Sequence, residues 1–93
     1  MVIPNNNQQN NFALVAEKTK KIISEIFSKN VNEISEETSF ISDLHAKSID
    51  TIALLAALEG EFKIKIPSQE VQGNQTVGQA IAYIESKLFK NQE

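Results

Sequence analysis

The sequence contains no cysteine among its 93 residues, and its only histidine is His45. Without cysteine the chain has neither disulfide bonds nor thiolate ligands for a metal ion. A single histidine also excludes a histidine-rich metal site, so we expect no metal. Any chemistry that requires a thiol must therefore use a group that comes from outside the chain.

Long apolar runs are also missing. No segment approaches the ~20 apolar residues that a transmembrane helix needs, so we expect no membrane insertion. The N-terminus has no basic region followed by an apolar stretch, so we expect no secretory signal. The length and the 41% hydrophobic content suit one domain with a small core. Together these features favour a soluble cytoplasmic protein.

The net charge of −3 is unevenly distributed. Residues 33–62 contain seven acidic residues and one basic residue, Lys47. Such a segment repels the phosphates of DNA and RNA, so we expect no nucleic-acid partner. It would attract basic patches on partner proteins and speed their encounter. The alternative is an acidic surface that is only solvated.

Residues 1–11 are rich in asparagine and glutamine and predict a disordered polar tail. The rest of the chain, residues 12–90, forms the predicted domain. Its first helix is expected over residues 12–28, because apolar and small side chains recur there every three or four residues. These predicted core positions are Phe12, Val15, Thr19, Ile22, Ile23 and Ile26.

Residues 29–47 show no sustained periodicity and predict a long loop. Loops longer than ~15 residues are uncommon in compact domains and are usually functional. We expect Phe40 and Leu44 to attach this loop to the core.

Ser48 begins the second predicted helix, over residues 48–62. A serine at the N-cap accepts a hydrogen bond from a backbone amide, and an acid such as Asp50 suits the first turn. Residues 52–58 are all apolar, so this helix must be buried on two sides or must serve a partner. We expect one set of residues to face the core (Leu54, Leu55, Leu58 and Phe62) and another to face partners or cargo (Ile49, Ile52 and Ala56). The alternative is that all seven apolar residues pack inside.

Two further helices complete the predicted fold. Ser68 can begin a short third helix that stops near Gly73, and Thr76 with Gln79 forms a capping-box pattern at the start of the last helix. The last helix has five predicted core residues, which are Val77, Ala80, Ile81, Ile84 and Leu88. No segment alternates cleanly enough to be a strand. The sequence therefore predicts an all-α fold, a small four-helix bundle with a short third helix and a long loop between the first two helices.

Several stretches in order along the chain resemble one family. They are Lys20-Lys21-Ile22-Ile23, Thr38-Ser39-Phe40, Asp43-Leu44, Ser48-Ile49-Asp50-Thr51, Ala57-Leu58-Glu59-Gly60-Glu61-Phe62, Ile66-Pro67, Thr76-Val77 and Ala80-Ile81-Ala82-Tyr83-Ile84. From Lys20 to Leu88 the chain resembles an acyl carrier protein, the small shuttle of fatty-acid and polyketide synthesis. The resemblance covers about three-quarters of the sequence.

The resemblance implies a function without catalysis. Ser48 would carry a 4′-phosphopantetheine arm, transferred from coenzyme A by a phosphopantetheinyl transferase, and the arm would hold acyl intermediates as thioesters. The protein would be a monomer and not an enzyme. It would present its cargo to acyl-loading, condensing and acyl-transfer enzymes through an acidic second helix. The predicted partner-binding residues are Asp43, Lys47, Ile49, Asp50, Ile52, Ala56 and Glu59.

The chain departs from the family pattern near this serine. Lys47 replaces a usual acid, His45 a usual glycine, and Ala53 a usual glutamate. Ala56 stands where a methionine-like contact is usual, and Asn74 replaces an apolar pocket residue. These changes make the docking helix less acidic, and they favour a specialised carrier over the housekeeping one.

Three other interpretations remain open at this stage. The cargo could be an amino acid or peptide, which would make the protein an aminoacyl or peptidyl carrier. The chain could be an unmodified helical interaction module in which Ser48 is only an N-cap. His45 and Ser48 also suggest a hydrolase, but no orienting acid, glycine elbow or oxyanion loop accompanies them.

Overall fold

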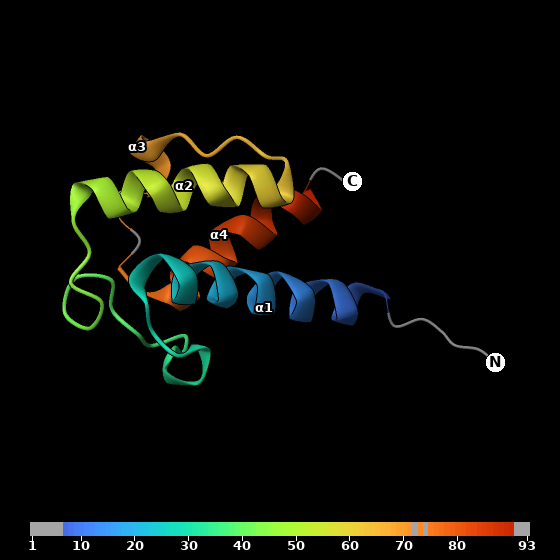
Figure 1. Cartoon of the computed structure of the whole chain (residues 1–93). Helices are drawn as coiled ribbons and strands as arrows, with labels where there is room; N and C mark the ends of the chain where they lie inside the picture. The colour runs from blue at the N-terminus through green and yellow to red at the C-terminus, as the bar shows by residue number, and fades with distance from the viewer. Residues whose placement is uncertain (1–6, 72, 74, 91–93) are drawn as a thin grey trace.

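Four α-helices and one short 3-10 helix make up the computed structural model, which describes residues 7–71, 73 and 75–90. The helices are α1 (Asn7–Phe27), α2 (Ser48–Phe62), α3 (Ser68–Val71) and α4 (Val77–Lys90), and the 3-10 helix η1 spans Val31–Glu33. Within the described ranges the only strand-like pairing is an isolated bridge between Ser39 and Thr76. The all-α fold with a short third helix and a long first loop is confirmed (Figure 1).

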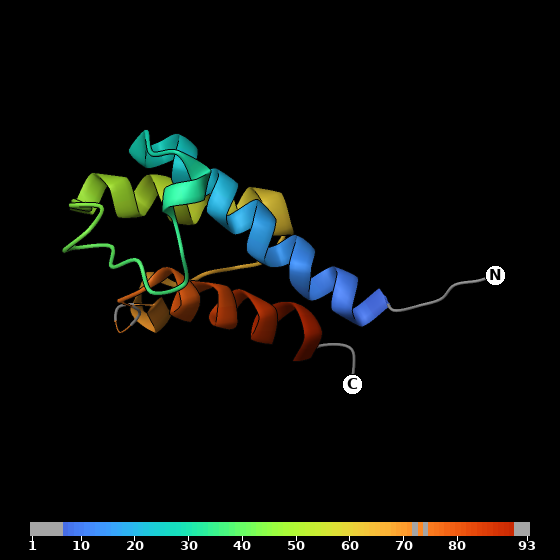
Figure 2. The same cartoon turned by 90° about the horizontal axis from the view of Figure 1, so that it is seen from below.

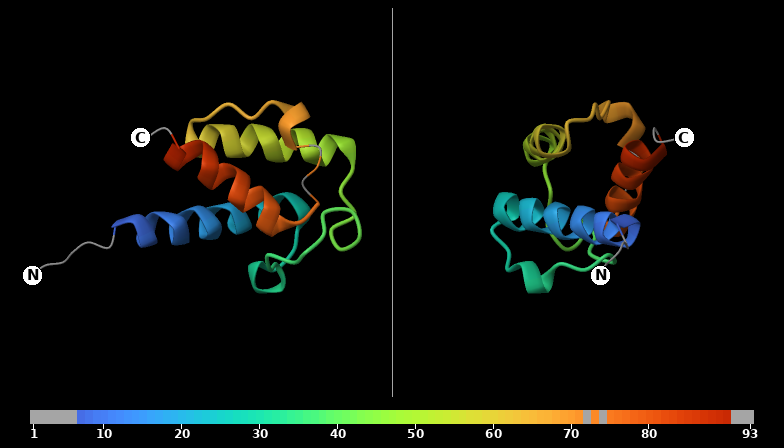
Figure 3. Two further views of the ribbon diagram at one scale, coloured as in Figure 1. Left: turned by 180° about the vertical axis from the view of Figure 1, so that it is seen from behind. Right: turned by 90° about the vertical axis from the view of Figure 1, so that its right-hand side faces the viewer.

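The long helices enclose one core. α1 contacts both α2 and α4. α1 and α2 run in opposite directions, and α4 crosses this pair at an angle, as the views from below and from the end show (Figures 2 and 3). The core collects apolar side chains from three helices and from the segments between them: Val15, Ile23, Ile34, Leu44, Leu54, Leu58, Ile66, Val77, Ile81 and Ile84.

Most core residues on α1 and α4 are those that the periodicity of the sequence predicts. Thr19 is also buried, although its side chain is polar. Its hydroxyl has no hydrogen-bond partner within the described residues. A buried hydroxyl without a partner costs about 1–3 kcal/mol. The Phe12 side chain lies outside the part of the chain that the structure describes.

α1 begins earlier than the predicted first helix. The helix begins at Asn7 and not at residue 12, so residues 7–11 are helical and do not belong to a disordered tail. Once a helix has formed, each further residue adds a hydrogen bond at little extra cost, and glutamine is a fair helix former. Residues 1–6 of the predicted tail lie outside the described residues.

The long loop is attached to the start of α4 by backbone hydrogen bonds. Val77 N–H donates to the Thr38 carbonyl at 3.0 Å, and Phe40 N–H donates to the Gln75 carbonyl at 3.0 Å. Leu44 is buried and Phe40 packs against the core, as predicted. Ile34 and Thr38 are buried too, which the sequence did not indicate.

The capping box at the start of α4 is confirmed. Gln79 N–H donates to the Thr76 hydroxyl at 3.2 Å, and Thr76 N–H donates to the Gln79 side-chain oxygen at 3.1 Å. Two backbone donors at the helix start are thereby satisfied.

Gly78 in the first turn of α4 allows a close backbone approach. Its N–H donates to the Glu36 carbonyl at 2.8 Å, and a β-carbon added at Gly78 would lie only 2.9 Å from the same oxygen. Gly60 on α2 is different, because a β-carbon there would meet nothing within 4 Å. Gly60 therefore provides a control for a substitution at Gly78.

We expect Gly78→Ala to lower the free energy of unfolding by about 1–3 kcal/mol, since the loop must move away from α4. Gly60→Ala should raise it by about 0.5–1 kcal/mol, because alanine favours an exposed helix. Urea denaturation measures both variants. A Gly78→Ala variant as stable as the wild type would contradict the close approach.

Side chains hold α3 against α4. The Tyr83 hydroxyl donates a hydrogen bond to the Glu70 carboxylate. Lys87 Nζ lies 3.4 Å from the same carboxylate and 5.7 Å from the centre of the Tyr83 ring. Burial and the hydrogen bond to Glu70 raise the pKa of Tyr83 from 10.0 to about 12. The Tyr83 hydrogen bond and the Lys87 charge lower the pKa of Glu70 from its ordinary value of 4.5.

Tyr83 is the only tyrosine, so tyrosinate absorbance reports on this contact alone. We expect the folded protein to titrate near pH 12, and Glu70→Gln to lower the Tyr83 pKa because the negative charge is lost. Because its pKa is raised on folding, the tyrosine stabilises the fold fully below pH 10.0, and this contribution is lost as the pH rises toward 12. The chain unfolded in guanidinium chloride serves as the control and should titrate near 10.0. An unchanged pKa in Glu70→Gln would show that the two side chains do not meet.

Candidate functional site

Ser48 lies in the first turn of α2, with its side chain exposed. It is the first helical residue and not the N-cap, which corrects the prediction. Lys47 is the N-cap, since its backbone is extended (φ −111°, ψ 170°) and its carbonyl accepts the Thr51 N–H at 3.0 Å. The Ser48 hydroxyl makes no hydrogen bond within the described residues, so this serine does not cap the helix.

The Asp50 carboxylate caps the helix in place of Ser48. It accepts the Lys47 N–H at 3.0 Å, which is one half of a capping box. The other half is missing because a lysine side chain has no acceptor. The N–H groups of Ser48 and Ile49 have no acceptor in the described part of the chain, and they lie at the positive end of the helix dipole. A phosphate on the serine oxygen fits this position.

The face of α2 that leads away from Ser48 is apolar and exposed. Ile49 and Ile52 are 73% and 67% exposed, and Ala56 is exposed as well. On the opposite side Leu54 and Leu58 are buried. Leu55 and Phe62 pack against the core. The buried and exposed sides of the helix are therefore as predicted, and the alternative that residues 52–58 all pack inside is wrong. That the exposed residues meet partners or cargo stays a prediction.

The acidic residues near Ser48 make hydrogen bonds within the protein. Asp43 accepts the Ser39 N–H at 2.7 Å, inside the loop. Glu59 accepts the Ile66 N–H at 2.8 Å and so fastens the segment that leaves α2. Sequence reasoning assigned both residues to partner binding and missed these contacts. The spacing in the sequence gives no signal for the Glu59 contact, because the chain must turn back after α2 to form it.

His45 has a left-handed backbone conformation, with φ of 57°, and its side chain is exposed. A residue with a β-carbon pays about 1–2 kcal/mol for this conformation, whereas glycine does not. His45 and Ser48 share no hydrogen bond within the described residues. The geometry therefore gives the hydrolase interpretation no support.

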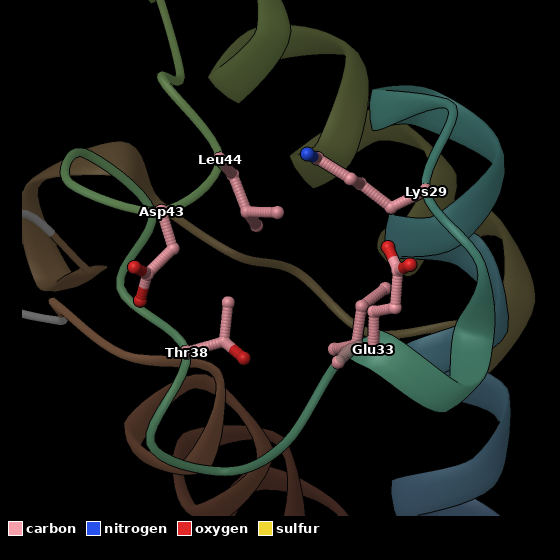
Figure 4. A pocket seen from close by; sticks show the side chains of 6 residues that line it. Lys29, Glu33, Thr38, Asp43 and Leu44 are labelled. Carbon is pink, nitrogen blue, oxygen red and sulfur yellow. The ribbon is translucent and has the colours of Figure 1, made fainter.

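A surface hollow of about 350 Å³ lies where the loop leaves α1 (Figure 4). Ile34 and Leu44 supply its apolar lining, and Lys29, Glu33 and Asp43 bring charged groups to it. Thr38 completes the lining. Its charged residues suit water better than an acyl chain, and Ser48 does not line it.

Residues 7–71, 73 and 75–90 lack two kinds of feature. No helix in these ranges is long and apolar enough to cross a membrane. No group of three or more histidine, aspartate or glutamate side chains there could hold a metal ion. Asn74, where the sequence departs from the family pattern, lies outside the described residues.

Comparison with known proteins agrees with this geometry. Residues 17–84 match the family described as the phosphopantetheine attachment site. The fold is also similar to that of the acyl carrier protein from Enterococcus faecalis, with 32% sequence identity and a TM-score of 0.70 over 82% of this chain and 96% of the other. The chain belongs to the acyl carrier protein family.

Membership of this family implies a covalent 4′-phosphopantetheine group. The group supplies a flexible arm that ends in a thiol, which this chain lacks. Members of the acyl carrier protein family are carriers and not catalysts.

Position 45, where the family usually has glycine, is one of three positions with positive φ among the described non-glycine residues.

We expect His45→Gly to raise the free energy of unfolding by about 0.5–1 kcal/mol, because glycine adopts the left-handed conformation without strain. Urea denaturation measures the change. His45→Ala is the control, since it removes the imidazole but keeps the β-carbon and the strain. An equal gain in both variants would mean that the imidazole, and not the backbone, carries the cost.

Proposed function

We propose that Ser48 carries the 4′-phosphopantetheine arm, and that the protein presents acyl thioesters on this arm to enzymes of the fatty-acid or polyketide type. The observation that carries this proposal is the exposed Ser48 hydroxyl, which makes no internal hydrogen bond in the described chain, at the start of α2. A serine used only as an N-cap would accept a backbone N–H. Asp50 caps the helix instead, which leaves the serine oxygen available.

The attachment of the arm needs only two reactants, Ser48 and coenzyme A. The Ser48 oxygen attacks the phosphorus atom of coenzyme A that bears the pantetheine, and a new phosphorus–oxygen bond forms. The bond to the nucleotide part breaks, and adenosine 3′,5′-bisphosphate leaves. The serine proton passes to a base of the transferase or to water. This chain contributes the nucleophilic oxygen, and the transferase contributes the catalysis.

The residues around Ser48 then support the product. The free N–H groups of Ser48 and Ile49 and the ammonium group of Lys47 all favour the negative phosphodiester. Since Ser48 is exposed, the arm extends into solvent. A tethered thioester reaches the active site of a docked enzyme at high effective concentration. The carrier provides the position, and the docked enzymes provide the chemistry.

We further propose that the protein serves a dedicated cytoplasmic pathway as a monomer and is not the housekeeping carrier. The residue types at Lys47 and Ala53 support this, because both residues are exposed within five residues of Ser48 in the sequence and neither is acidic. The similarity to an acyl carrier protein supports acyl cargo over aminoacyl cargo.

Intact-protein mass spectrometry tests the attachment site. After incubation with coenzyme A and a set of phosphopantetheinyl transferases, we expect the mass of the wild type to rise by one phosphopantetheine. Ser48→Ala should gain nothing, because the nucleophilic oxygen is gone. Ser68→Ala is a matched control, since Ser68 is also an exposed serine that begins a helix, α3. It should be modified like the wild type.

Two results would contradict the proposal. Modification of Ser48→Ala would place the arm elsewhere, and no modification of the wild type by any transferase would favour an unmodified interaction module. The modified protein can then be offered to acyl-loading enzymes and to aminoacyl-adenylating enzymes. Loading only with amino acids would assign it to the aminoacyl carriers.

A further inference from the structure

The surface hollow of Figure 4 lies within reach of Ser48. Leu44 lines the hollow and precedes Ser48 by only four residues. Four residues in extended form span at most about 14 Å, so the two Cα atoms are no farther apart than this. The main chain of a phosphopantetheine arm contains about as many bonds as four residues, and it therefore reaches about as far. An arm on Ser48 can thus reach the hollow while the helices keep their places.

Two charged groups in the hollow lack partners. The ammonium group of Lys29 and the carboxylate of Glu33 form no ion pair and no side-chain hydrogen bond within the described residues. Both belong to the wall where α1 ends and η1 lies, and Leu44 faces them from the loop (Figure 4). The volume of about 350 Å³ lies at the small end of ligand-binding pockets. The hollow therefore has room and free hydrogen-bonding groups for a small polar ligand.

The pantetheine part of the arm is complementary to this lining. It contains amides, a hydroxyl group and a pair of geminal methyl groups, and it carries no charge. An ammonium group donates to an amide carbonyl, and a carboxylate accepts an amide N–H or a hydroxyl. Ile34 and Leu44 supply apolar surface for the methyl groups. Because this part of the arm is neutral, the acidic residues of the hollow can bind it and do not repel it.

We propose that the pantetheine part of the arm rests in this hollow between visits to enzymes, with Lys29 and Glu33 as its hydrogen-bond partners. This inference rests on the proposed function, because it requires an arm on Ser48. Weak contacts are enough, since a short flexible tether gives an effective concentration in the millimolar range. A site with millimolar affinity for the free group is then about half occupied. For the rest of the time the arm extends into solvent, where a docked enzyme can take it.

NMR spectroscopy of the protein with its arm tests the resting place. The transferase that modifies the wild type attaches an unlabelled arm to isotope-labelled protein, so that isotope filtering selects contacts between the two. We expect nuclear Overhauser effects (NOEs) from the geminal methyl groups of the arm to the side chains of Ile34 and Leu44. Relative to the protein without the arm, the backbone amide signals of Lys29 and Glu33 should shift.

Substitutions of the two charged residues test their roles. Loss of a hydrogen bond to a charged group weakens a contact about tenfold or more. Lys29→Ala should therefore lower an occupancy near one half to about one tenth and weaken the NOEs about fivefold. Glu33→Ala should act in the same way. Glu33→Gln keeps an acceptor oxygen and should retain most of the NOE intensity.

Lys21→Ala is the matched control for Lys29→Ala. Lys21 is an exposed lysine of α1 that does not line the hollow. Its variant should give the NOEs of the wild type. Circular dichroism checks the folding of each variant.

The outcomes separate the two proposals. An arm on Ser48 without NOEs to Ile34 or Leu44 would overturn this inference and leave the proposed function intact. NOEs as strong in Lys29→Ala as in the wild type would overturn it as well, because the ammonium group would then hold nothing. No attachment of an arm to Ser48 would overturn the proposed function and this inference together.

Discussion

The packing of Leu54 and Leu58 against the core fixes the rotation of α2 about its own axis. Once one side of a helix is buried, the spacing of 3.6 residues per turn decides which residues lie on the opposite side. Ile49 and Ile52 are thereby turned to solvent, and Ser48 begins the helix at the surface. The exposure of Ser48, the proposed attachment site, depends on this one packing contact.

The position of the first turn of α2 depends in addition on the long loop. Backbone hydrogen bonds join this loop to the start of α4, and Gly78 allows the closest of these approaches, to Glu36. The buried Leu44 then holds the end of the loop near Ser48. A segment without regular secondary structure can therefore hold Ser48 in a defined place.

The acidic side chains near Ser48 stabilise the fold through hydrogen bonds to the backbone. The carboxylates of Asp43, Asp50 and Glu59 accept backbone N–H groups that would otherwise lack partners. Each carboxylate keeps its negative charge when it accepts a neutral N–H group, so it stabilises the fold and still contributes to the electrostatic potential that a partner meets. The sequence around Ser48 therefore predicted correctly that this segment is acidic. It did not reveal all the backbone N–H groups that the carboxylates bind.

The sequence by itself determined the helices, the capping box of Thr76, the two-sided character of α2 and the family resemblance around Ser48. These features depend on neighbours within about four residues, so local spacing reveals them. The cap of α2 is local as well, although the sequence placed it one residue too late, at Ser48 instead of Lys47. Only the tertiary structure decided that Glu59 binds Ile66 N–H and that His45 has a left-handed backbone. Both features depend on how the chain turns between helices. Contacts between segments decide these turns, and they leave no periodic signal in the sequence.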